Sequence, residues 1–292
     1  MKTHIAPLLI LLSLATVFTT ACGDSAAPQF TQLTFISDRV VIPATPIFTA
    51  KLDGTSVTPV PSTASGMYYP SISRDAKTVA FEASGDAWVQ KADGTGVLNL
   101  TTATTSNSEI NFVGISPDGK RVLFSENNAD HIHIINVDGT GDLDLTATLP
   151  AGMNNCYSGS FNASSTLIVF VCSGATNYGL YTIKPDGTGT TTVTATRTVW
   201  TDLPFFTPDG KKIIFVGETA SVFDVESIGL DGSGDVVLAS NTFESVVINS
   251  SFYYTFHDTV LGLNQVYKAK LDGTAAVSIS DGLHNDSLSL AQ

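Results

Sequence analysis

Basic residues are scarce in this sequence. It contains 14 Lys and Arg against 27 Asp and Glu, which gives a formal net charge of −13 over 292 residues. The chain therefore lacks the excess of positive charge that draws proteins to phosphate backbones and to anionic lipid headgroups. We predict that it does not bind nucleic acid.

Familiar catalytic motifs are also missing. The sequence has no Gly-x-Ser-x-Gly nucleophile elbow, no phosphate-binding Walker loop and no His-Glu-x-x-His zinc motif. These absences favour a non-catalytic protein that needs no cofactor.

Long apolar runs are limited to the N-terminus. Residues 5–18 (IAPLLILLSLATVF) follow Lys2 and are shorter than the roughly 20 residues of a transmembrane helix, which is typical of a signal peptide. The run ends in TTAC, and these small residues before Cys22 resemble the lipobox of bacterial lipoproteins. The resemblance implies a signal peptide at residues 1–21, acylation of Cys22 and a short membrane-proximal linker at residues 22–28. The alternative is ordinary secretory cleavage nearby.

What the sequence has in abundance are turn and strand residues. It is 43% hydrophobic and only 14% charged, with 24 Gly and 12 Pro. This composition favours strands joined by tight turns. An Asp-Gly pair between two strand-like runs predicts a hairpin, and such pairs recur at intervals of 40 to 48 residues, beginning at Asp53, Asp93, Asp138, Asp186, Asp231 and Asp272.

A second turn motif recurs in phase with the first. Residues 115–124 (ISPDGKRVLF) and 206–215 (FTPDGKKIIF) are nearly identical, and residues 72–81 and 161–170 are weaker copies. Each unit then contains four antiparallel strands, which is the pattern of a propeller blade. The two motifs together resemble the TolB-type propeller repeat of exported bacterial proteins. The resemblance implies an all-β, six-bladed propeller of four-stranded antiparallel blades over residues 29–292, without the separate N-terminal domain of TolB.

The two ends of the propeller region are incomplete repeats. Residues 32–37 (QLTFIS) align with the second strand of a blade, whereas residues 285–292 (NDSLSLAQ) align with a first strand. We predict that the C-terminal strand pairs into blade 1 and closes the ring, which removes exposed strand edges.

The first strands of the blades are expected to line a central channel. We aligned them on their last apolar residue, matching Leu290 with Ile115. The residues four positions earlier are polar or Tyr, and they form our candidate ligand-binding ring: Tyr68, Asn111, Tyr157, Asp202, Glu244 and Asp286. Such a ring could hold a divalent cation or a polar ligand, or it could be only the wetted wall of the channel.

The remaining cysteines and a histidine pair are further candidates. Cys156 and Cys172 fall on neighbouring strands of one blade, so we predict a cross-strand disulfide, with two free buried thiols as the alternative. His131 and His133 share one face of a strand at a spacing that can chelate a metal. Their expected place on the outer part of a blade instead favours simple solvent exposure, so a metal site stays unassigned.

Taken together, these features predict a monomeric, non-catalytic scaffold in the bacterial cell envelope. The resemblance implies a lipid anchor at Cys22 in the outer membrane, on its periplasmic face or at the cell surface. The partner would be an envelope protein or a small polar ligand. The alternative is a channel-based lyase or hydrolase, or a carbohydrate-binding protein. Oligogalacturonate lyases resemble this repeat, but they use a His-rich channel site, and no residue of the ring is His.

Overall fold

The computed structural model describes most of the repeat region. The described residues are 32–36, 47–51, 56–62, 64, 66–101, 110–126, 131–147, 149, 154–173, 178–194, 198–199, 204–219, 222–248, 251–258, 263–278 and 290–291. All secondary-structure elements in these ranges are strands, and none of these ranges holds a helix long and apolar enough to cross a lipid bilayer. The predicted signal peptide, Cys22 and the linker lie outside them.

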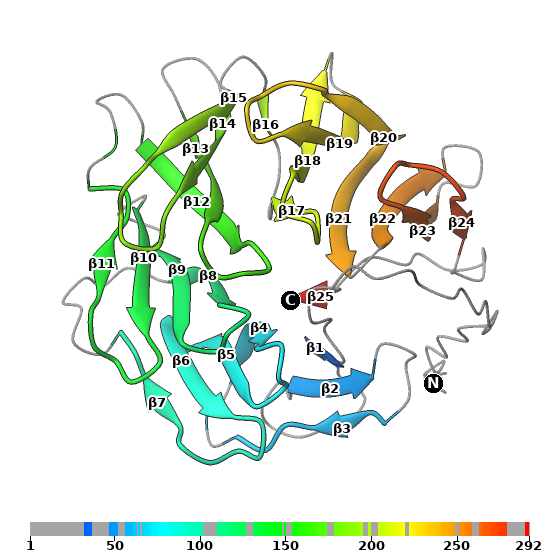
Figure 1. Cartoon of the computed structure of the whole chain (residues 1–292). Coiled ribbons are helices and arrows are strands. Elements are labelled where there is room, and N and C mark those ends of the chain that lie inside the picture. The colour runs from blue at the N-terminus through cyan, green and yellow to red at the C-terminus, as the bar shows by residue number, and fades with distance from the viewer. Residues whose placement is uncertain are drawn as a thin grey trace, which may run out of the picture.

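The described strands form six antiparallel sheets arranged around a common centre (Figure 1). The first sheet has the order β25-β1-β2-β3, with β25 (Leu290–Ala291), β1 (Gln32–Ile36), β2 (Ile47–Lys51) and β3 (Thr58–Pro59). The next contains β4 (Met67–Ile72), β5 (Thr78–Ala83), β6 (Asp86–Lys91) and β7 (Leu98–Asn99). The third contains β8 (Ile110–Ile115), β9 (Arg121–Glu126), β10 (His131–Asn136) and β11 (Leu143–Asp144).

The other three sheets continue the ring in chain order. The fourth contains β12 (Asn154–Phe161), β13 (Ile168–Ser173), β14 (Tyr178–Ile183) and β15 (Thr191–Thr194). The fifth contains β16 (Thr198–Val199), β17 (Phe205–Phe206), β18 (Lys212–Thr219), β19 (Val222–Gly229) and β20 (Val236–Ser240). The sixth contains β21 (Thr242–Ile248), β22 (Ser251–Asp258), β23 (Leu263–Lys270) and β24 (Val277–Ser278).

Five of the six predicted Asp-Gly hairpins lie within the described residues and are present, whereas Asp53 lies outside them. The Asp side chains explain the motif. Oδ1 of Asp138 accepts hydrogen bonds from the backbone N–H of Thr140 at 3.0 Å and from its hydroxyl at 2.6 Å. Gly139 takes a left-handed φ of 81°, which a residue with a Cβ adopts only at a cost. The same pair of bonds forms at Asp93, Asp186, Asp231 and Asp272. Asp and Gly are therefore required by the turn itself.

A repeated phenylalanine anchors the core. The second strands of four sheets place a fully buried ring at the same position, namely Phe81, Phe124, Phe170 and Phe215. Their partners on the third strands are Trp88, His133, Tyr181 and Glu226. Burial of such a side chain contributes about 1.5–3 kcal/mol, so these positions are a large part of what holds the sheets.

Apolar clusters join each sheet to the next. Five clusters are found among the described residues, and each contains residues of two consecutive sheets, from the first pair of sheets to the fifth and sixth. Side-chain hydrogen bonds supplement them. The hydroxyl of Thr34 donates to the carbonyl of Pro70 at 3.1 Å, and that of Ser160 donates to the carbonyl of Pro204 at 2.6 Å. The sheets are thus fixed in position relative to their neighbours.

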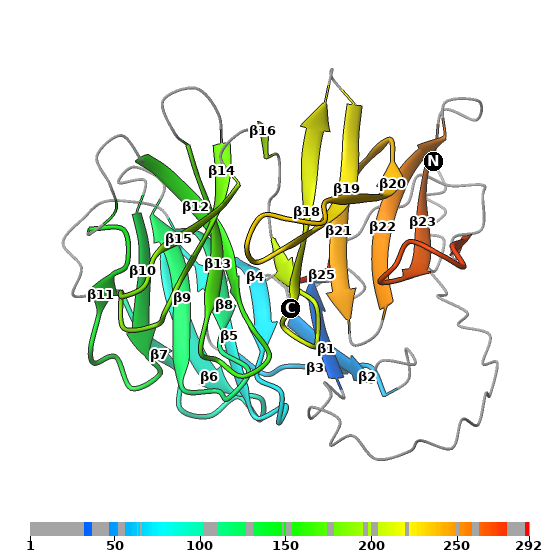
Figure 2. The same cartoon turned by 45° about the horizontal axis from the view of Figure 1, so that its top comes forward.

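The two ends of the described chain meet in the first sheet. β25 pairs antiparallel with β1 through Thr34↔Ala291 and Phe35↔Leu290, and Figure 2 shows the two strands side by side. Leu290 pairs with Phe35, and Val113 pairs with the equivalent residue Phe124, so Leu290 corresponds to Val113. Our sequence alignment, which matched Leu290 with Ile115, was wrong by two residues, because the incomplete C-terminal repeat has no turn motif to fix its register.

A disulfide joins the first two strands of the fourth sheet. Cys156 and Cys172 are direct cross-strand partners with Cα atoms 4.0 Å apart, and their sulfur atoms are bonded. Both residues are buried. The bond therefore connects the innermost strand, β12, to the body of its sheet.

Candidate functional site

The candidate ring residues belong to the innermost strands of the sheets. Three of them share one level, because each pairs with the residue that follows a core aromatic on the second strand. These pairs are Tyr68↔Glu82, Tyr157↔Val171 and Glu244↔Thr255. The backbone register therefore brings three of the six predicted positions to equivalent places.

Asn111 does not share this level. It is the extra residue of a β-bulge between Ile110 and Phe112, and Phe112 takes the equivalent position opposite Ser125. A bulge adds one residue to one strand and turns the following side chains by one position. Counting back from the turn could not detect this insertion. The side chains of Asn111 and Glu244 and the whole of Asp202 and Asp286 lie outside the described structure.

The two tyrosines of the ring have different surroundings. Tyr68 is 51% exposed, and its neighbour Tyr69 is 47% exposed. The Tyr157 ring is only partly exposed and packs edge-on against Tyr178 at a centroid distance of 5.6 Å. Tyr68 is therefore available to a ligand, whereas Tyr157 contributes mainly to packing.

Irregular backbone is common to these inner strands. Register shifts occur in β4, β8, β12 and β21, and the inner edge of the fifth sheet is divided between β16 and β17. In β4 the shift lies between Tyr68 and Ser71, and Tyr69 adopts a left-handed φ of 49°. Bulges re-aim side chains and are frequent beside functional sites. Here the bulge exposes two tyrosines in sequence at the start of β4.

The opposite end of the inner strands is tied together by turns. The guanidinium Nη2 of Arg74 donates to the carbonyl of Ala163 at 2.5 Å, linking turns of the second and fourth sheets. Its backbone N–H donates to the carbonyl of Pro117 at 3.1 Å. Burial lowers the pKa of Arg74, and the carboxylate of Asp118 opposes that effect. This end has a structural role, which leaves the end at Tyr68 as the candidate binding face.

Metal-ligating side chains gather elsewhere. Among the described residues, the group of three that could hold a metal is His131, His133 and Asp144, on the two outer strands β10 and β11. The sequence indicated the two histidines but missed Asp144. The signal that could have found it is the Asp138–Gly139 hairpin, because its register carries β11 back along β10.

No family model matches the sequence, and no curated protein matches it. Solved structures do match. TolB from Acinetobacter baumannii superposes with a TM-score of 0.62 at 16% identity, over 83% of this chain and 62% of that chain. A putative TolB from Agrobacterium tumefaciens has a TM-score of 0.59 at 16% identity, over 88% and 93% of the two chains. This chain has the fold of a TolB-like β-propeller.

Enzymes also share this propeller fold. An oligogalacturonate lyase in complex with manganese matches with a TM-score of 0.64 at 11% identity, over 85% of this chain and 73% of that chain. The chain spans less than two thirds of the Acinetobacter TolB structure. At these identities the TolB-like propeller supplies a frame for function, and the function depends on the side chains mounted on it.

Proposed function

We propose that this TolB-like propeller is a monomeric, non-catalytic scaffold that binds an envelope protein or a small polar ligand through the face at Tyr68. The observation that carries the proposal is the exposed pair Tyr68 and Tyr69, 51% and 47% accessible, at the start of an innermost strand. Tyrosine offers a large contact area and a hydroxyl group with little loss of side-chain freedom on binding.

The frame beneath this face supports a role in recognition. Neighbouring sheets share buried clusters, and the turns at the far end are hydrogen-bonded to one another through Arg74, Pro117 and Ala163. A rigid body that presents variable loops is the usual way in which propellers and similar scaffolds bind partners.

Site-specific photo-crosslinking tests this proposal. A benzophenone amino acid at Tyr68 should capture one envelope protein in intact cells, and the product should disappear when Tyr69 is replaced by Asn, which tolerates the left-handed φ. The matched control is the same probe at Val237, which is 50% exposed on β20. A product of the same mass at both sites, or none at Tyr68 together with no thermal shift in a panel of sugars, contradicts the proposal.

We also propose that the protein reaches this partner from a membrane anchor. The TolB-type fold, the apolar run at residues 5–18 and the small residues before Cys22 support a signal peptide at 1–21, a lipid on Cys22 and a linker at 22–28. The seven linker residues reach at most about 25 Å, so the propeller would stay close to the outer membrane. Cys22→Ser should move the protein from the membrane to the soluble fraction, and mass spectrometry of the wild type should show acylation of Cys22.

The finer architecture is part of the proposal. The six sheets are taken as six blades, and β25 as the strand that closes the ring. Five apolar clusters join consecutive sheets, while the pairing of β25 with β1 supports the remaining joint. Deleting residues 285–292 should lower the melting temperature of the whole domain. A truncated protein that melts at the wild-type temperature would contradict closure.

The second candidate is a channel-based lyase, hydrolase or carbohydrate-binding protein. The likeness to the fold of a manganese-bound lyase and the shared level of Tyr68, Tyr157 and Glu244 favour it. It predicts a thermal shift with Mn²⁺ or an acidic oligosaccharide that Glu244→Gln abolishes. A shift that survives Glu244→Gln would remove the ring from consideration.

A further inference from the structure

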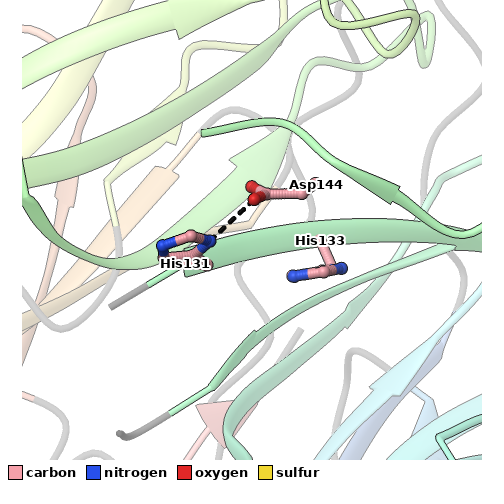
Figure 3. A group of neighbouring side chains, drawn as sticks. All are labelled: His131, His133 and Asp144. Atoms are coloured by element: carbon pink, nitrogen blue, oxygen red, sulfur yellow. Dashed lines mark hydrogen bonds and ion pairs between the residues drawn. The ribbon is translucent and has the colours of Figure 1, made fainter. Parts of the chain in front are cut away.

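The outer strands of the third sheet bring two imidazoles and a carboxylate together. His131 and His133 lie on one face of β10, with ring centroids 6.4 Å apart and planes inclined by 24°. Asp144 of β11 is the direct cross-strand partner of His133. Figure 3 shows its carboxylate reaching the ring of His131, with His133 beside them. One ligand atom from each of the three residues lies within 4.8 Å of the others.

The carboxylate of Asp144 is held in place by its neighbours. Its Oδ1 accepts hydrogen bonds from the N–H of Thr146 at 2.8 Å, the hydroxyl of Thr146 at 2.6 Å and the N–H of Ala147 at 3.1 Å. Its Oδ2 faces Nδ1 of His131 at 2.6 Å. One oxygen of the Asp144 carboxyl group is thus oriented toward the imidazoles.

The two histidines differ in freedom. The ring of His133 stacks on the buried ring of Phe124 at 5.2 Å, and its Nδ1 lies 2.9 Å from Oδ1 of Asp142. Its side chain is 16% exposed, whereas that of His131 is 46% exposed. A fixed ligand beside an adjustable one suits a site that must tighten around an ion. Carboxylate partners of ligating histidines are a common supporting element in metal sites.

We propose that His131, His133 and Asp144 bind one Zn²⁺ ion. Tetrahedral Zn²⁺ with bonds of about 2.0–2.1 Å to nitrogen and oxygen places its ligand atoms about 3.3 Å apart. Nδ1 of His131 and Oδ2 of Asp144 are now 2.6 Å apart, and one ligand atom from each of the three residues lies within 4.8 Å of the others, so small side-chain movements would reach that spacing. Two imidazoles and one carboxylate favour zinc over Mg²⁺ or Ca²⁺, which prefer oxygen alone. The fourth position remains for water or for a donor from outside the chain.

The second sheet provides an internal comparison. Its register pairs Trp88 with Asn99 as the third sheet pairs His133 with Asp144, and Asp86 occupies the place of His131. There Nδ2 of Asn99 donates to Asp86 at 2.8 Å, and Oδ1 of Asn99 accepts the N–H of Thr101 at 2.9 Å. Equivalent backbone positions thus carry Asp, Trp and Asn in the second sheet, and two His and one Asp, which are all zinc-type ligands, in the third sheet.

That comparison supplies variants that preserve the fold. Asp144→Asn introduces the residue that the second sheet already accommodates, with its bond to the threonine two residues on. The double variant H131D with D144N recreates the hydrogen-bonded pair of Asp86 and Asn99. Both variants should therefore fold like the wild type, which circular dichroism and the melting temperature without metal will check.

Calorimetric titration of the chelator-treated full chain with ZnCl₂ tests the proposal. The wild type should bind one Zn²⁺ and melt at a higher temperature with the ion. D144N should weaken binding at least about tenfold, and the double variant should abolish it. The control His257→Ala should bind like the wild type.

The proposal is overturned by any of three results. These results are a wild type that one equivalent of Zn²⁺ does not saturate, a double variant that binds as tightly as the wild type, and a melting temperature that Mg²⁺ raises as much as Zn²⁺ does. The second result would assign the ion to other groups of the chain, and the third would indicate general screening of its acidic surface.

Discussion

Gly217 in β18 should not accept even a single added methyl group. A Cβ at this position would lie 2.5 Å from Oε1 and 3.1 Å from Cδ of Glu226, and 3.3 Å from the Phe215 ring. Glu226 is 1% exposed, so its carboxylate has no open solvent to move into. Gly217→Ala therefore either strains the strand or displaces the buried carboxyl group of Glu226 from its partners.

The size of the effect follows from these two routes. Overpacking a well-packed core costs about 1–3 kcal/mol, and leaving a buried polar group without its partners costs a similar amount, about 1–3 kcal/mol. Because the structure will relax along the less costly route, we expect a loss of about 1–3 kcal/mol in the free energy of unfolding. With a urea m-value of about 3 kcal/mol/M, the midpoint should fall by about 0.3–1 M.

Urea unfolding followed by circular dichroism measures this loss, and a double-mutant cycle identifies its cause. Glu226→Ala removes the atoms that a Cβ at Gly217 would strike, so Gly217→Ala should become nearly neutral in that background, with a coupling of about 2 kcal/mol. Gly210→Ala is the comparison without a clash, because no atom lies within 4 Å of its Cβ position. Its left-handed φ of 68° makes the added Cβ costly for the backbone alone, so its effect should not depend on Glu226. Equal losses from Gly217→Ala in both backgrounds would refute the clash with Glu226.

Three further predictions concern the frame. Replacing Cys156 and Cys172 by Ala should lower the free energy of unfolding by about 3 kcal/mol, because the bond closes a loop with a sequence separation of 16; reduced wild type should then unfold like the variant in urea. Ala76→Gly should raise stability by about 0.5–1 kcal/mol, since Ala76 has a φ of 58° where Gly119 and Gly210 stand in other turns; an unchanged thermal melt would contradict this. Stability should fall as the pH drops below about 4. Hydrogen bonds from the Thr or Ser two residues later lower the pKa values of the hairpin carboxylates below the ordinary Asp value. The carboxylates therefore stabilise the fold fully above the ordinary Asp pKa, and this stabilisation is lost as the pH falls through their lowered pKa values. The carboxylates are Asp93, Asp138, Asp186, Asp231 and Asp272. Asp138→Asn should reduce the acid dependence in a pH series of urea melts, and an undiminished dependence would assign it to other groups.

The sheets and hairpins could be predicted because their causes are local. The Asp side chain, the hydroxyl two residues later and the left-handed Gly act within five residues, so each copy of the motif carries its own instructions. Alternating apolar residues then decide which face is buried. The order of strands in four of the six sheets follows directly from this series of local hairpins.

The ring could be predicted only in part because its causes are not local. A bulge at Asn111 moves Phe112 to the ring level, and nothing in the hydrophobic pattern of β8 marks the inserted residue. Tyr157 has the predicted level but turns toward Tyr178, a contact set by packing between strands. The register thus sets the level of an inner-strand residue, and packing between strands sets the orientation of its side chain.

Comparison of the repeats shows where a side chain departs from the pattern shared by the sheets. The position opposite the core aromatic holds a ring in most sheets, including Trp88, Tyr181 and Tyr267. Glu226 breaks this pattern, and the missing side chain of Gly217 gives its carboxylate room. His133 keeps a flat ring that still stacks on Phe124, so the packing is preserved while two nitrogens are added.

An imidazole at this position adds nothing to the core that a phenyl ring would not supply, and it brings polar atoms that need partners. Asp142 provides one such partner, and His131 with Asp144 completes a donor set that the neighbouring sheet lacks. The frame orients the Asp144 carboxylate through Thr146 and Ala147, but it does not explain why two histidines stand beside that carboxylate. A ligand that binds nitrogen and oxygen together would explain the combination, which is why the outer face of β10 and β11 is where zinc should be sought.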